Sequence, residues 1–219
     1  MNRGLETGGS RPGLAPGRPT GASSRWPTPL DCSPMAFLLE LWVPILAAAV
    51  FVFLASSVIH MLLPVHRNDY RGLPDEEALQ ALARIAPGDY VFPWAGSMAE
   101  MQQPDFTARL QSGPVGFLTL MPHGSFRMGS ALAFWFLYSV LISAICAYIA
   151  HATLDPGAEY LQVFRITGAV AFTAYAFANA QSSIWKGVSW IMTLKFAGDG
   201  LVYALVTAGA FAWLWPAAA

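Results

Sequence analysis

Four long apolar stretches dominate this sequence and limit what it can fold into. They cover residues 36–63, 128–151, 160–183 and 188–216. A helix of about 20 apolar residues, rising about 1.5 Å per residue, crosses the roughly 30 Å hydrocarbon layer of a bilayer, so each stretch is long enough to span it. The sequence therefore predicts an all-α membrane protein with four transmembrane helices.

The composition agrees with a membrane protein and excludes other classes. Apolar residues make up 55% of the chain and charged residues 11%, well below the charged fraction of about 25% in soluble domains. The net charge of -1 leaves no surplus of Lys and Arg to neutralise phosphates, which excludes a nucleic-acid partner. Cys32 lies in a polar segment and Cys146 in an apolar stretch, so we expect no disulfide framework.

Residues 1–34 have the composition of a disordered tail. They contain six Gly, six Pro and four Arg without apolar periodicity, so they cannot bury enough surface to offset the entropy of ordering. Met35 then opens directly onto the first apolar stretch. Two alternatives stay open: a disordered tail that is expressed, or a mis-assigned extension with Met35 as the native start.

The distribution of Arg and Lys predicts the orientation, because cytoplasmic loops retain these residues near the ends of membrane spans. Beyond the tail, most of them lie between the first and second stretches or just after the third: Arg67, Arg71, Arg84, Arg109, Arg127 and Lys186. The segment 152–159 contains none. We therefore expect 64–127 and 184–187 in the cytoplasm, with Met35 and the C-terminus outside. Only the arginines of the tail argue against this orientation.

The segment 64–127 is predicted to be a small cytoplasmic α+β insertion, or cap, lying on the membrane face between the first two transmembrane helices. Pro74 and the acidic residues after it begin a short amphipathic helix. Residues 89–92 and 115–121 fit strands, and 104–111 fit a second helix. The alternative for 115–121 is an apolar segment that lies on the membrane surface or re-enters the membrane.

The expected organisation is a tail over 1–34, transmembrane helix 1 over 35–63, the cap over 64–127, and transmembrane helices 2 to 4 over 128–216. Within it, three motifs carry a resemblance: DYRGLPDE at 69–76, PGDYVFP at 87–93 and GPVGFLTLMP at 113–122. Over roughly residues 35–216 the chain resembles an uncharacterised family of bacterial four-span inner-membrane proteins. The resemblance implies a multi-pass protein of the bacterial plasma membrane, and it implies no functional residue.

Ionisable residues at membrane depth call for an explanation, because a charge in hydrocarbon is costly unless it pairs or reaches water. Glu40 and Arg165 lie at similar depth near the outer face. We expect them to form a structural ion pair that holds the first and third helices in register, with Asp155 and Glu159 as competing partners of Arg165. The functional alternative is a gate or a ligand contact.

A polar cluster in the cytoplasmic half of the bundle is the main candidate site: His60, Asn179, Gln181, Lys195 and Asp199. Lys195 and Asp199 are four residues apart and share a helix face. The structural interpretation is that Lys195 reaches the membrane interface and Asp199 accepts its charge, or that the residues make interhelical hydrogen bonds. The functional interpretation is a hydrated pocket, faced by His60 and Asp199, for a proton, a cation or a polar head group.

No catalytic, cofactor or metal motif is recognisable. The four histidines lack metal-ligand spacing, and His60 and His151 should lie near opposite membrane faces, which argues against a haem cage. Pro64 separates His60 from His66. A Walker-type phosphate loop is absent and Cys146 has no adjacent base. We expect no catalytic, cofactor-binding or metal-binding residue.

Functions of different classes stay open. The preferred one is a non-catalytic component or accessory of a membrane complex, with the lipid bilayer and either another membrane protein or further copies of the chain as partners. The alternative is a small transporter or channel-like protein that uses the polar cluster, although the inverted repeats of many carriers are not found here. A third is an enzyme acting at the membrane interface.

Overall fold

The computed structural model describes residues 35–124 and 127–218. Within them, four helices are long and apolar enough to cross a membrane, as expected of a multi-pass membrane protein. They run over Trp42–Leu62, Met128–Thr153, Tyr160–Lys186 and Trp190–Trp213. The tail expected over residues 1–34 lies outside the described residues.

The first span is interrupted near its start and widened at its end. α1 (Ala36–Glu40) stops before α2 (Trp42–Ser57), because the ring of Pro44 clashes with the carbonyl four residues earlier in a continuous helix. α2 passes directly into the π-helical turn η1 (Val58–Leu62), which has a wider hydrogen-bonded ring than an α-helix. Leu63 is then extended, as expected of a residue before proline.

The third and fourth spans are joined by a tight turn. The third consists of α6 (Tyr160–Ala176), the 3-10 turn η4 (Phe177–Asn179) and α7 (Ala180–Lys186). α7 ends at Gly187, whose φ of 69° is a left-handed conformation that glycine adopts without strain. α8 (Trp190–Trp213) then runs back along the third span.

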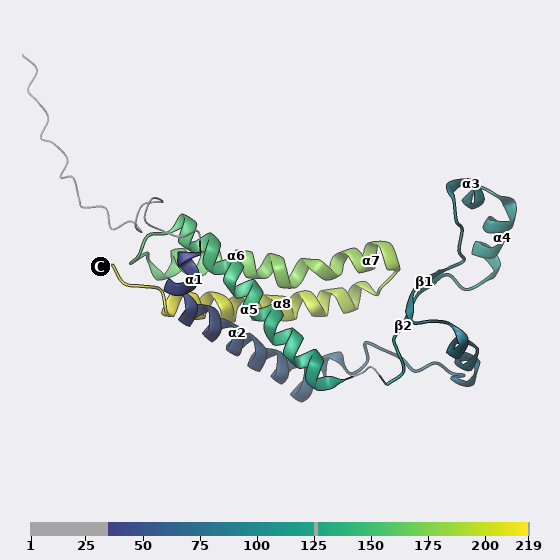
Figure 1. Ribbon diagram of the computed structural model, residues 1–219, viewed down its shortest axis with the longest axis horizontal. Helices are drawn as coiled ribbons and strands as arrows, with labels where there is room; N and C mark the ends of the chain where they lie inside the picture. Colours follow the sequence, from purple (N-terminus) through teal and green to yellow (C-terminus); the bar gives the residue numbers. More distant parts are fainter. Residues whose placement is uncertain (1–34, 125–126, 219) are drawn as a thin grey trace, which may run out of the picture.

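The closest helix packing in the bundle is between α6 and α8. Figure 1 shows α6 and α7 beside α8, with α2 and α5 (Met128–Thr153) crossing them. A Cβ on Gly200 of α8 would lie 2.9 Å from the backbone nitrogen of Ala176, and a Cβ on Gly168 of α6 would lie 3.2 Å from Ala208. Glycine at these positions therefore permits the backbone approach that stabilises helix pairs in lipid, where packing replaces the hydrophobic effect.

The loops and chain ends gather at the two ends of the bundle. At one end the loop between α5 and α6 meets the C-terminal segment, where the amide of Gly157 donates to the carbonyl of Pro216 at 2.7 Å. α1 packs at this end too, with the ring of Phe37 5.5 Å from that of Tyr148. The other end holds the turn at Leu63 and the turn between α7 and α8. The spans therefore alternate in direction, and the chain's first helix and its C-terminus share one end.

The predicted α+β insertion is present, with one helix that the pattern did not indicate. Its elements are η2 (Pro64–His66), η3 (Glu77–Arg84), β1 (Gly88–Phe92), α3 (Met98–Met101), α4 (Pro104–Ser112) and β2 (Gly116–Leu120). β1 and β2 pair antiparallel, with Gly88 opposite Leu120 and Phe92 opposite Gly116. The segment 116–120 is therefore a paired strand, as the pattern over 115–121 predicted.

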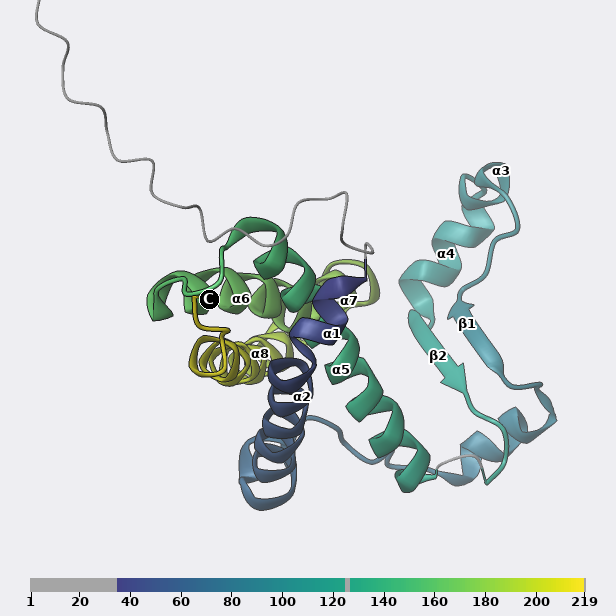
Figure 2. The same ribbon diagram turned by 60° about the vertical axis from the view of Figure 1, so that its left-hand side comes forward.

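The amphipathic helix predicted from Pro74 onward is the 3-10 helix η3, and it starts later than expected. The carboxylate of Asp75 accepts hydrogen bonds from the amides of Glu77 and Ala78, and η3 begins there. Figures 1 and 2 show that β1, β2, α3 and α4 project away from the bundle. The insertion is thus an arm that projects from the bundle (Figures 1 and 2).

Gly200→Ala should destabilise the bundle, because the new Cβ would meet the backbone of Ala176, which cannot move as a side chain can. Overpacking of this kind costs about 1–3 kcal/mol. We expect a lower melting temperature in detergent. Gly209→Ala on the same helix is the matched control: nothing lies within 4 Å of its Cβ, so its melting temperature should be unchanged or higher. Equal melting temperatures for the two variants would contradict the close approach of α6 and α8.

Candidate functional site

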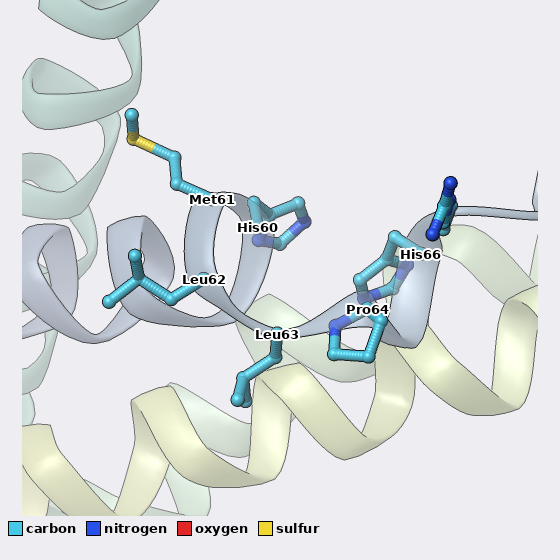
Figure 3. A pocket seen from close by; sticks show the side chains of 7 residues that line it. His60, Met61, Leu62, Leu63, Pro64 and His66 are labelled. Carbon is cyan, nitrogen blue, oxygen red and sulfur yellow. The ribbon is translucent and has the colours of Figure 1, made fainter.

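Two histidines meet where the first span ends and the chain turns back. His60 lies on η1, and the extended Leu63 followed by the η2 turn carries His66 round to it (Figure 3). The two rings stack with centroids 4.6 Å apart and planes at 3°. In a continuing α-helix, residues six apart would be separated by about 9 Å along the axis. The break in the helix therefore creates the pair.

Asp199 of α8 faces these histidines from the neighbouring span. Its Oδ2 lies 2.9 Å from Nε2 of His66 and 3.9 Å from Nε2 of His60. Asp199 is 7% exposed, and it lies about 13 Å along the helix axis from the start of α8 at Trp190. A carboxylate buried at this depth is costly unless cationic or hydrogen-donating groups surround it. The imidazoles are the groups that the fold brings to it.

A second carboxylate holds His66 from its other side. Oδ2 of Asp69 lies 2.6 Å from Nδ1 of His66, and Oδ1 accepts a hydrogen bond from Nζ of Lys195. Lys195 also donates to the carbonyl of Val65 at 2.8 Å. The hydrogen bond from Lys195, and after it the one from His66, hold the pKa of Asp69 below its usual value. Asp69 is therefore an anion fixed between His66 and Lys195.

The hydrogen-bond partners assign the protons on both imidazoles. Nδ1 of His60 lies 3.1 Å from the carbonyl of Ser56, which can only accept, so Nδ1 carries the proton. The same holds for Nδ1 of His66 against the carboxylate of Asp69. In the neutral imidazole the remaining nitrogen is then an acceptor. The Nε2 lone pairs of both residues are thus available on the side of Asp199.

A pocket of about 640 Å³ lies beside this cluster. Its walls come from α2, η1, α5, α6, η4 and α8, and most of them are apolar or aromatic, including Leu132, Trp135 and Phe196. Trp135 is fixed by a hydrogen bond from its Nε1 to Oγ of Ser56 at 2.9 Å. His60, Asn179 and Asp199 line the same pocket and give it a polar side.

The hydroxyl of Tyr203 is an unused polar group in the pocket wall. Tyr203 is 4% exposed, and its hydroxyl has no hydrogen-bond partner among the described residues. The ring is held by edge-on contacts with Trp135 at 5.7 Å and Tyr175 at 5.5 Å. A buried hydroxyl without a partner is destabilising.

The structure brings together part of the polar cluster that we expected. His60 and Asp199 lie side by side, and Asn179 lines the pocket. Gln181 is exposed and is not among the described lining residues. Lys195 joins through Asp69, and the ion pairs of the described residues do not include one between Lys195 and Asp199. The reason is that Val65 and Asp69 offer Lys195 two acceptors in the turn.

The expected ion pair between Glu40 and Arg165 is not formed. Oε2 of Glu40 lies 3.2 Å from Nε2 of His151. Over the described residues no ion pair within 4.0 Å involves Arg165, either with Glu40 or with its expected competitors Asp155 and Glu159. α1 packs on α5, which carries His151, and Arg165 is exposed on α6. Glu40 therefore links the first span to the second and not to the third.

Sequence reasoning missed His66 and Asp69 as members of the site. The separation of six residues between His60 and His66 fits no regular ligand spacing, and Pro64 lies between them. Two features of the sequence could have indicated that His66 belongs to the site. The proline predicts an extended residue before it and a turn after it, and the intramembrane Asp199 requires a partner that its own helix does not supply.

The chain has no counterpart in the comparisons with known proteins. No family model, no curated protein and no solved structure matches it. Its resemblance to the bacterial four-span family stays a proposal, and the function has to be inferred from the site itself.

Proposed function

We propose that this membrane protein binds an amphiphilic molecule in the pocket beside His60 and Asp199. The apolar part of the molecule lies along Leu132, Trp135 and Phe196, and its polar group lies against the hydroxyl of Tyr203 and the carboxylate of Asp199. The observation that carries the proposal is the combination of a 640 Å³ apolar pocket with a buried, unpartnered hydroxyl in its wall. Binding pockets typically join apolar walls to a few placed polar groups.

The position of the pocket suits a molecule that enters from the bilayer. Met61, Leu132 and Tyr138 line it and are also exposed at membrane depth, so the walls continue into a surface that lipid covers. At bilayer interfaces, aromatic side chains such as Trp135 and Tyr138 combine an apolar ring with a polar edge. A molecule with an apolar chain and one polar group matches both properties of this site.

Binding fits the geometry better than conduction across the membrane. The polar lining residues gather at the end of the bundle that holds His60. Toward the other end, residues with no exposed surface fill the space between the helices, among them Ala48, Cys146, Ala147 and Val163. A transporter pathway would need hydrated surface there, and the hydroxyl residues of that region, such as Ser143 and Thr207, have no exposed surface either. We therefore place the amphiphile-binding function ahead of the transporter.

Membership of a membrane complex is the second candidate, and the arm formed by 64–127 favours it. Trp94 and Met98 in the arm are 68% and 71% exposed, and they lie outside the spans where lipid would cover them. Exposed apolar groups in a polar segment are typical of surfaces that bind another protein. The partner would be another membrane protein or a further copy of this chain.

We also propose that the chain lies in the bacterial inner membrane with 64–127 in the cytoplasm. The distribution of Arg supports this orientation. So does the alternation of the spans, because the arm and the turn at Lys186 lie at one end of the bundle and the C-terminus at the other. The site of His60 and Asp199 would then face the cytoplasmic leaflet.

Filling the pocket should abolish binding of an amphiphile. We expect Leu132→Trp, in lipid nanodiscs, to bind dansyl-labelled undecanol, whose hydroxyl can donate to Asp199, at least about tenfold more weakly than the unmodified chain, which corresponds to about 1.4 kcal/mol. Leu137→Trp is the matched control, because Leu137 lies on the same helix, is 59% exposed and does not line the pocket. Tyr203→Phe should weaken binding about two- to tenfold through loss of one hydrogen bond. Equal affinities for the two Trp variants would rule out this pocket.

Membership of a complex is tested by measuring the protein mass of the chain and its partners after extraction in mild detergent. The unmodified chain should elute with a protein mass well above 23.6 kDa, and Trp94→Ser combined with Met98→Ser should reduce that mass toward the single chain. The double variant keeps the spans intact, so its melting temperature should be unchanged. A single-chain mass for the unmodified protein would contradict this candidate.

The orientation of the chain is tested by labelling single cysteines introduced into a variant in which Cys32 is replaced by Ser. Cys146 is kept, because it has no exposed surface and should not react with the label. A membrane-impermeant maleimide added to intact spheroplasts should label Ala217→Cys and leave Gln111→Cys, in the arm, unlabelled until the membrane is opened. Both positions are exposed. Labelling of Gln111→Cys in closed spheroplasts would reverse the orientation.

A further inference from the structure

We propose that His60, His66 and Asp199 bind one divalent transition-metal ion, with Zn²⁺ as the best match. One ring nitrogen of each histidine and a carboxylate oxygen of Asp199 all lie within 4.8 Å of one another. The site comes from two separate spans and the turn after the first. It does not depend on what fills the neighbouring pocket, so it stands or falls separately from the proposed amphiphile.

The ligand atoms have the chemistry that zinc prefers. Two neutral imidazoles and one carboxylate form a common set in sites where three protein groups bind zinc and a fourth position stays open. Zinc binds these atoms at about 2.1 Å, so tetrahedral ligand atoms lie about 3.4 Å from one another. The observed separations from Oδ2 of Asp199, 2.9 Å to His66 and 3.9 Å to His60, bracket that value.

The contact between His66 and Asp199 requires a positive charge. Nε2 of His66 and Oδ2 of Asp199 are both buried, and neither has a hydrogen-bond partner among the described residues although they lie 2.9 Å apart. A neutral His66 with its proton on Nδ1 would turn a lone pair toward the Asp199 carboxylate, which is repulsive unless a second proton or a metal ion lies between the two atoms. A metal ion between the two atoms removes the repulsion and neutralises a carboxylate buried in a membrane span.

The groups behind the ligands are those that usually support metal-bound histidines. Such histidines donate their other N–H to a carboxylate or a backbone carbonyl, which fixes the ring and raises its basicity. Here the carboxylate of Asp69 accepts from His66, and the carbonyl of Ser56 lies 3.1 Å from Nδ1 of His60. Lys195 fixes Asp69 in turn, and the ring of Phe196 stacks on His66 at 5.2 Å. The N–H side of both rings is therefore anchored before an ion arrives, and the stacked rings tilt toward each other when both Nε2 atoms bind one ion.

The backbone around the site fits the same purpose. The π-helical turn η1 carries His60. Such turns are rare in proteins and occur frequently at functional sites. His60 and Asp199 also line the apolar pocket, so the open coordination position would be next to it. A bound water, or the polar group of a molecule in the pocket, would complete the coordination.

The test uses the full chain without an affinity tag, stripped of metal by a chelator and then equilibrated with Zn²⁺ alone. Elemental analysis after removal of free ion should give about one zinc per chain. Removal of a residue that supports a metal ligand typically lowers the affinity for the metal about 10–100-fold. The ligand variants His66→Ala and Asp199→Asn should lower the affinity for zinc by more than this. His123→Ala, in the arm, is the matched control and should keep the full zinc content. Co²⁺ in place of Zn²⁺ should give the visible absorption of a tetrahedral site, absent in His66→Ala.

Asp69→Asn keeps the inference testable if the ligand variants do not fold. It leaves the three ligands in place and should weaken zinc binding about 10–100-fold. Failure of the unmodified chain to retain zinc would overturn the proposal and leave a protonated His66 paired with Asp199. Zinc retained equally by His66→Ala and the unmodified chain would overturn it as well. Neither result bears on binding of the dansyl-labelled alcohol, so the two proposals can fail separately.

Discussion

Neutralisation of the Asp199 carboxylate within the helix bundle is the constraint on which this end of the molecule depends. Lys195, one turn away on the same helix, does not provide it, because its ammonium group binds Asp69 and the carbonyl of Val65. The groups that face the carboxylate are instead His60 and His66, on the first span and the turn after it. The first and last spans therefore meet through polar groups at one end, in addition to apolar packing along their length.

Helix packing and site chemistry meet at one point of α8. Gly200 brings the backbone of α8 against α6, and its neighbour Asp199 is buried by the same approach. One turn further on, Tyr203 is wedged between Trp135 and Tyr175 and forms the pocket wall. A cation at the histidines and a polar group in the pocket would thus be separated by only a few atoms, which is the arrangement needed for one to influence the other.

The sequence predicted those features that depend on local pattern. The four apolar spans follow from their length, and the strands predicted over 89–92 and 115–121 are found over 88–92 and 116–120. Contacts between distant segments were harder to predict. Arg165 and Glu40 have matching depth and opposite charge, but depth does not determine which side of a helix a residue occupies, and α1 packs on α5. His66 was missed because its position depends on a turn geometry that no spacing rule describes.

The wide turn over Val58–Leu62 has a consequence for how the site is specified. An α-helical and a π-helical turn differ by about one residue, and one residue of α-helix corresponds to about 100° of rotation. A chain one residue shorter here would regain a regular helix and deliver Pro64, with everything after it, to a different side of the bundle. The number of residues between the two imidazoles therefore determines their alignment to a greater extent than any side chain along that stretch.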